Sequence, residues 1–98
     1  MKIIVRPSAR NDLSNGRDFY ERQGEGLGDY FAESLSSDID SLKVYAGIHL
    51  KSHGFFRAIS KRFPYAIYYD LEKQTVRIWA VLDCRQDPSA IRRRLRQL

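Results

Sequence analysis

The feature that most constrains the fold is a change in hydrophobic periodicity part-way along the chain. Between residues 27 and 45, apolar side chains recur at steps of three and four, which predicts an amphipathic helix. After residue 54 the chain instead contains short segments that resemble strands, and between residues 75 and 83 apolar residues alternate with a period of two. There, one alternating set faces the core and the other is partly open; the two sets are Val76, Ile78, Ala80 and Leu82, and Arg77, Trp79, Val81 and Asp83. This change of period predicts helices that cover a sheet.

Shorter signals supply the elements before this helix. Residues 2–6 form an apolar run rich in β-branched side chains, which predicts a strand. Pro7-Ser8 ends it, and Ser8 is expected to cap a helix that begins at Ala9. The segment Gly24-Glu25-Gly26 breaks this helix and is expected to join it to the next one as an antiparallel hairpin.

The remaining elements follow residue 45. Residues 46–54, which include both histidines, are expected to form a loop, and the segments 55–60, 65–71 and 75–83 are expected to be strands joined by turns. Asp87-Pro88 predicts the start of a short basic helix with Ile91, Leu95 and Leu98 on one side. The predicted fold is α+β, in the order β-α-α-β-β-β-α, with an antiparallel sheet packed against a two-helix hairpin. A length of 98 residues predicts one domain over residues 1–98.

Charge is distributed unevenly along the chain. Residues 1–53 carry seven Lys or Arg and eight Asp or Glu, whereas residues 54–98 carry ten and four. Such asymmetry is typical of proteins that bind nucleic acid, a membrane surface or an acidic protein. The alternative is an ordinary solvated surface.

The residues that could hold a metal or a cofactor are few. Cys84 is the only cysteine, so it supports neither an intramolecular disulfide nor a cysteine-based metal cluster. It is expected to pack as a small apolar residue. His49 and His53 are four residues apart but lack a third ligand, so no metal and no cofactor are expected. With no long apolar run and no secretory leader, the chain is expected to be cytoplasmic and to bind no membrane.

Two segments carry a family resemblance. They are Phe63-Pro64-Tyr65-Ala66-Ile67-Tyr68-Tyr69 and Ala80-Val81-Leu82-Asp83-Cys84-Arg85-Gln86-Asp87-Pro88. Together with the element order, they make almost the whole chain similar to the RelE/ParE superfamily of toxins from type II toxin–antitoxin systems. The resemblance implies a toxin, of a kind linked to plasmid stabilization, whose partner is a cognate antitoxin: a short, often acidic chain that wraps the toxin.

The superfamily divides by activity. RelE-like members cleave mRNA on the ribosome with basic residues on the sheet, often with a C-terminal Tyr or His, whereas ParE-like members are associated with inhibition of DNA gyrase. Ala66 or Ile67 stands where the resemblance places a nuclease arginine, and no Tyr or His follows Tyr69. The resemblance therefore favours a ParE-like inhibitor of gyrase. One alternative is a ribosome-dependent mRNA endonuclease that uses Arg57, Arg62, Arg77 or Arg85 as phosphate clamps. Another is a degenerate relative that binds a partner but is not toxic.

The favoured hypothesis assigns no catalytic residue and expects arginines to contact the partner or the target. These are Arg57, Arg62, Arg77, Arg85, Arg92, Arg93, Arg94 and Arg96. Each has a structural alternative. Arg57 and Arg77 can face solvent or pair with acidic residues on neighbouring strands, and Arg85 can anchor its turn through backbone carbonyls or Asp87. The last four arginines can form a solvated helix face. Aromatic residues of the strands, which could stack on bases, are expected to lie in the core or to cover the sheet edge; they are Tyr65, Tyr68, Tyr69 and Trp79.

Overall fold

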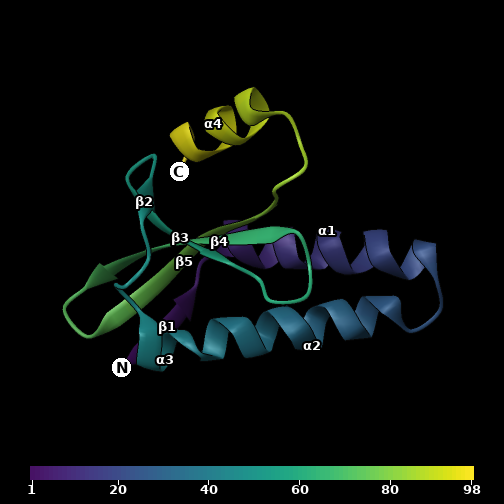
Figure 1. Ribbon diagram of the computed structural model, residues 1–98, viewed down its shortest axis with the longest axis horizontal. Coiled ribbons are helices and arrows are strands. Elements are labelled where there is room, and N and C mark those ends of the chain that lie inside the picture. Colours follow the sequence, from purple (N-terminus) through teal and green to yellow (C-terminus); the bar gives the residue numbers. More distant parts are fainter.

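The computed structural model describes all residues from 1 to 98 and shows a five-stranded sheet with helices on both faces (Figure 1). The strands lie in the order β1-β5-β4-β3-β2. β1 pairs with β5 in parallel, and every other pair is antiparallel. The predicted α+β order is confirmed. The strands are β1 (Lys2–Val5), β2 (Lys51–Ser52), β3 (Phe55–Ile59), β4 (Tyr65–Glu72) and β5 (Thr75–Asp83).

The predicted helical hairpin is present and packs tightly. Helices α1 (Pro7–Gln23) and α2 (Leu27–Asp40) run side by side, and the loop that joins them projects beyond the sheet (Figure 1). Two glycines permit this close approach. A Cβ on Gly16 would lie 2.5 Å from Cζ of Phe31, and one on Gly28 would lie 2.8 Å from the carbonyl oxygen of Arg17. Any larger residue would therefore force the helices apart.

Each face of the sheet has its own core. On the hairpin face, twelve buried apolar residues form one cluster, in which the ring of Phe31 lies 4.9 Å from that of Tyr65. The partly buried Phe63 packs against this cluster, with its ring 5.1 Å from that of Phe31. On the other face, Leu95 of α4 (Pro88–Arg96) is buried in a smaller cluster. The sheet residues of that cluster are Ala66, Tyr68, Ala80 and Leu82. Strand β4 therefore contributes alternate side chains to both cores.

The alternation predicted for residues 75–83 is wrong in its second half. Tyr68 pairs with Ala80 while the next residue, Tyr69, pairs with Ile78, so Trp79 is an extra residue in β5. This β-bulge reverses the side-chain direction beyond it. As a result Ile78 packs against the helical hairpin, but Ala80 packs under α4.

Two expected helix boundaries also differ. Ser8 is not the N-cap, because α1 already begins at Pro7, and the hydroxyl of Ser8 donates instead to the carbonyl oxygen of Trp79 at 2.7 Å. The helix expected over residues 27–45 is interrupted at Ser41, where a separate short helix, α3 (Leu42–Tyr45), begins. The hydroxyl of Ser41 donates to the carbonyl oxygen of Asp38 at 2.6 Å, a local bond that competes with helix geometry.

The segment 46–54, expected to be a loop, contains β2 and a hairpin. Ser52 pairs with Phe55 across the two-residue turn His53-Gly54. Both turn residues have positive φ, 56° and 85°, which matches the tight turn that suits the twist of a hairpin. The predicted start of the last helix is confirmed, because the carboxylate of Asp87 accepts a hydrogen bond from the backbone N–H of Ser89 at 2.8 Å.

Candidate partner-binding surface

Arg77 is held by acidic residues of its own hairpin. It lies opposite Asp70 in the β4–β5 register, and its guanidinium donates to both carboxylate oxygens of Asp70 at 2.8 Å. Glu72 adds a further contact at 3.1 Å. The hydrogen bond from Arg77 to Asp70 raises the pKa of the arginine. Since two carboxylates neutralise it, Arg77 has little charge left for an anionic partner.

Arg85 is likewise occupied, but by a partner that the sequence did not indicate. Its Nε and Nη2 donate to the two oxygens of Asp83 at 3.0 Å and 2.8 Å. Its backbone N–H also donates to Asp83, at 2.8 Å. The hydrogen bond from the Arg85 side chain holds the pKa of Asp83 below its ordinary value. Arg85 therefore closes the turn after β5 through Asp83 rather than through Asp87 or backbone carbonyls.

Arg94 differs from the other arginines of α4 because it points inward. Its guanidinium contacts both oxygens of the buried carboxylate of Asp12, at 2.7 Å and 2.8 Å. The same carboxylate accepts the backbone N–H of Val81 at 3.0 Å. One buried aspartate of α1 therefore ties α4 and β5 together, and Arg94 is a structural anchor.

Arg57 lies half-buried on the α4 face of the sheet and has no carboxylate partner. Its Nε donates to the hydroxyl of Tyr68 at 3.2 Å, and its Nη2 lies 3.5 Å from Sγ of Cys84. The hydrogen bond to Tyr68 raises the pKa of Arg57. Cys84 packs against the smaller core. No carboxylate therefore neutralises the charge of Arg57, although its side chain is only partly exposed.

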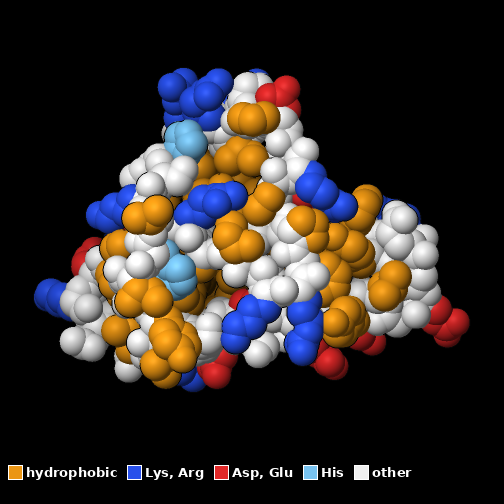
Figure 2. All heavy atoms as spheres, viewed as in Figure 1, with side chains coloured by type: hydrophobic (Ala, Val, Ile, Leu, Met, Phe, Trp, Pro, Cys, Tyr) orange, Lys and Arg blue, Asp and Glu red, His pale blue; other side chains and the backbone are white.

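The remaining four arginines, Arg62, Arg92, Arg93 and Arg96, are exposed and make no ion pair. Three of them cover the outer surface of α4 together with Ser89 and Gln97. Arg62 lies beside Lys61 in the turn between β3 and β4. Figure 2 shows Lys and Arg side chains over both places. We call these four residues the free arginines.

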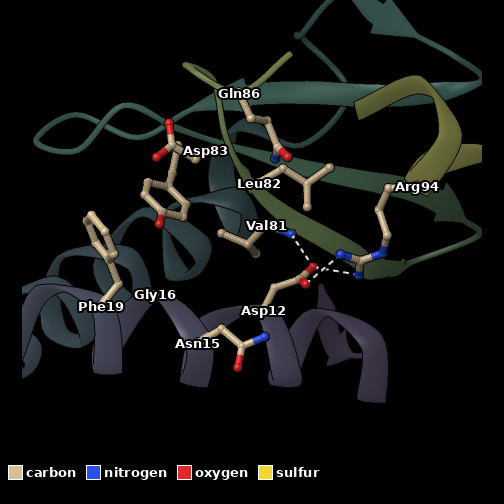
Figure 3. Close-up of a pocket in the computed structure, with 10 residues that line it drawn as sticks. Asp12, Asn15, Gly16, Phe19, Val81, Leu82, Asp83, Gln86 and Arg94 are labelled. Atoms are coloured by element: carbon tan, nitrogen blue, oxygen red, sulfur yellow. Dashed lines mark hydrogen bonds and ion pairs between the residues drawn. The ribbon is translucent and has the colours of Figure 1, made fainter. Parts of the chain in front are cut away.

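A cleft of about 350 Å³ lies between α1 and the end of β5. Figure 3 shows Asn15 on α1 and Gln86 beyond β5 on opposite sides of it, with the Asp12–Arg94 pair at one end and Phe19 at the other. Burial raises the pKa of Tyr65, which also lines the cleft, to about 12, so its hydroxyl stays neutral at physiological pH. No sequence motif marks this cleft, because its walls come from segments about seventy residues apart.

The histidines and strand aromatics have structural positions. His49 Nδ1 lies 2.5 Å from the hydroxyl of Tyr69, and burial lowers the pKa of His49. His53 lies at the tip of the β2–β3 hairpin, so the two histidines do not converge. The three strand tyrosines are buried, as expected, whereas Trp79 is only half-buried beneath the guanidinium of Arg6. None of the helices has the length and apolar character needed to span a membrane.

Comparison with known proteins decides the family. The family model described as the ParE toxin of type II toxin-antitoxin system, parDE, matches residues 3–88. The chain belongs to the ParE toxin family. A chain from the solved structure "Chromosomal ParDE TA system from P. aeruginosa" is similar with a TM-score of 0.73 and 15% identity, covering 83% of this toxin and 92% of that chain. At this identity the likeness shows a common fold. Comparison with curated proteins gave no match.

Membership of the ParE family confirms the resemblance seen in the sequence and implies an antitoxin partner. The match ends at residue 88, where α4 begins. Arg62 therefore lies within the part of the chain that resembles the family model. The three free arginines of α4 lie beyond it, on a helix attached through Arg94 and the smaller core.

Proposed function

We propose that this ParE family toxin poisons DNA gyrase by binding it, without a catalytic step of its own, and that a cognate antitoxin neutralises it. The observation that supports this proposal is the division of the arginines into two groups. Arg77, Arg85 and Arg94 have carboxylate partners within the chain, whereas the free arginines are on the outer surface. A protein–protein inhibitor needs only such a complementary charged surface.

The same division disfavours the alternative, an mRNA endonuclease. Attack by a ribose 2′-hydroxyl needs a general acid and base, and cations close to the developing negative charge. Two of the arginines suggested as phosphate clamps, Arg77 and Arg85, would first have to leave their carboxylates. In addition, α4 covers part of the sheet face on which Arg57 lies.

The proposed neutralising partner suits the surface chemistry. The free arginines and Lys61 offer unpaired positive charge. The exposed apolar residues Tyr45, Ile48 and Ile59 line one cleft together with Lys61. A chain that is both acidic and partly apolar can satisfy both features at once. This combination matches the short acidic antitoxins expected for the superfamily.

A supercoiling assay with purified gyrase tests the proposal. We expect the toxin to inhibit the reaction, and we expect the triple variant Arg92→Glu/Arg93→Glu/Arg96→Glu to need about tenfold more protein for the same inhibition, because charge reversal weakens binding to a complementary surface. The matched control Lys2→Glu/Arg10→Glu/Arg22→Glu makes the same change of net charge on exposed residues of the N-terminal half. It should retain inhibition.

Two results would contradict the proposal. Supercoiling that is unaffected at saturating toxin would exclude gyrase as the target. New 5′ ends within translated messages, mapped soon after induction of the toxin, would show RNA cleavage and so reject an inhibitor without catalysis. Loss of growth inhibition when the neighbouring gene is co-expressed tests neutralisation by the antitoxin.

A further inference from the structure

Strand β3 has an outer edge that is only half covered. The two residues of β2 pair with Phe55 and Phe56, and the backbone N–H of Arg57 then donates to the carbonyl oxygen of Leu50 at 3.0 Å. Beyond this bond, β3 continues to Ile59 without an outer neighbour. Because Ser60 N–H bonds inward to Tyr65, the N–H and C=O of Ile59 point outward and have no partner. Open edges of this kind are templates for another strand.

Exposed apolar side chains surround this edge. We call Tyr45, Ile48, Leu50 and Ile59 the edge patch. Ile48 and Leu50 are 72% and 88% exposed. Figure 2 shows hydrophobic side chains gathered over α3 and the segment leading to β2, with Lys and Arg side chains over the nearby β3–β4 turn. Contiguous apolar surface with a polar rim marks an interaction site.

Two clefts lie on either side of the open edge. The first, of about 130 Å³, lies on the hairpin face and is mainly apolar; its apolar lining is Leu42, Tyr45, Ile48, Ala58, Ile59 and Ile67. The second, of about 460 Å³, contains two cations, Lys51 and Arg57. Ile59 and His49 line both clefts, which places the edge between them.

We propose that the open edge of β3 receives an acidic, extended segment as an additional strand. Successive side chains of a strand point to opposite faces of the sheet. One residue of the incoming segment would therefore enter the apolar cleft, and the next would enter the cleft with Lys51 and Arg57. Backbone bonds to Ile59 provide affinity, and the two clefts select alternating apolar and acidic side chains.

The charge around this edge favours an acidic segment over a second copy of this chain. Lys51, Arg57, Lys61 and Arg62 are all at or near it, and none has an ion-pair partner. Asp38, the acidic residue of the apolar cleft, accepts the hydroxyl of Ser60. A second copy of this chain would bring like charges together, which opposes pairing, whereas an acidic segment gains from them. That this segment belongs to the antitoxin rests on the proposed function.

Peptide binding to the full-length toxin tests the proposal. The probe is a capped peptide of roughly seven residues, the length of an ordinary strand, with alternating glutamate and valine; the matched peptide has lysine in place of glutamate. We expect the glutamate peptide to bind at least about tenfold more tightly, and to slow amide hydrogen exchange at Ile59 by about tenfold or more. N-methylation of its edge-facing amides should abolish this protection. Lys51→Glu should reduce or reverse the preference, whereas the remote control Arg22→Glu should keep it.

Other outcomes would overturn the proposal. Equal binding of both peptides would show that the edge does not select an acidic strand. Unchanged hydrogen exchange at Ile59 under saturating glutamate peptide would show that the peptide does not pair with this edge. Protection of Ile59 that grows with toxin concentration alone would assign the edge to a second copy. The peptide measurements contain no gyrase. A supercoiling assay that shows no inhibition would therefore reject gyrase as the target without affecting the conclusion about the β3 edge.

Discussion

The helical hairpin on one face of the sheet buries twelve apolar residues with it, whereas α4 on the other face shares a cluster of only five. The hairpin depends on aromatic packing around Phe31. In contrast, α4 is held by Leu95, by Ile91 packed against the same cluster, and by the Arg94–Asp12 ion pair. Since three inward-facing residues are enough to attach α4, its other side chains are free to serve a partner.

The largest effect should come from the hairpin face. Phe31 is fully buried and contacts three aromatic rings. We expect Phe31→Ala to lower the free energy of unfolding by about 3–5 kcal/mol, because it leaves a cavity as well as losing burial. Urea denaturation measures this loss. Phe19→Ala, at a residue that is 39% exposed, is the control and should cost much less; equal losses would show that the face is not held by this packing.

The anchor of α4 should give the next largest effect. Asp12→Ala removes the carboxylate that bonds Arg94 and the N–H of Val81. We expect a loss of about 2–3 kcal/mol in unfolding free energy, below the value for a fully buried pair because the Arg94 side chain is 30% exposed. The double variant Asp12→Ala/Arg94→Leu should recover part of this loss, since no unpaired charge remains. A double variant no more stable than Asp12→Ala would contradict the anchor role.

A smaller effect should appear as a dependence on pH. Because the hydrogen bond from Arg85 lowers the pKa of Asp83 in the folded state, protonation is easier in the unfolded state. The stabilisation is therefore present above the unfolded pKa, about 4, and is lost as pH falls through the lower folded value. Thermal unfolding below about pH 4 should show a weaker decline for Asp83→Asn than for the unmodified chain. Parallel curves would mean that the pair contributes nothing.

The smallest effect on stability is expected at the exposed arginines of α4, where we expect a large effect on binding. Replacing all three exposed arginines of α4 with alanine should change the unfolding free energy by only about 0.5 kcal/mol, since none makes an ion pair. The residues are Arg92, Arg93 and Arg96. The same variant should lose affinity for its partner, measured by titration calorimetry. A marked loss of stability would show that both sides of α4 hold the fold.

The element order was predictable because each long segment carries a local signal of its own. Residues 27–40 show the period of the helix that they form, and residues 65–72 begin with an apolar run bounded by turns, which is typical of a buried strand. Local signals failed where a single residue changed the geometry. Ser41 interrupts a helix whose apolar pattern continues beyond it, and Trp79 adds one residue to a strand that otherwise alternates. His53-Gly54 was a usable turn signal, but β2 is only two residues long.

The candidate site was less predictable, because it depends on contacts between distant parts of the chain. Arg94 comes three residues after Ile91 and therefore lies beside the apolar stripe of α4. Nothing in the sequence, however, pairs it with Asp12, 82 residues earlier, which makes it an anchor. Arg77 and Arg85 pair with carboxylates much closer in the sequence, Asp70 and Asp83, and a pair with a neighbouring strand was already one of the alternatives for Arg77. The sequence thus indicates a basic half of the molecule, whereas the tertiary contacts decide which of its charges stay available.

The parallel pairing of β1 with β5 affects how the molecule is made. Residue 2 is synthesised early, but its strand partner is Thr75, and β1 has no other neighbour in the sheet. The hydrogen bond from Ser8 to Trp79 and the ion pair between Asp12 and Arg94 also need residues that are synthesised much later. Contacts of such long sequence separation slow folding, and they cannot form while the last strand and helix are inside the ribosome. The nascent chain therefore lacks its native surface until β5 and α4 have both left the ribosome.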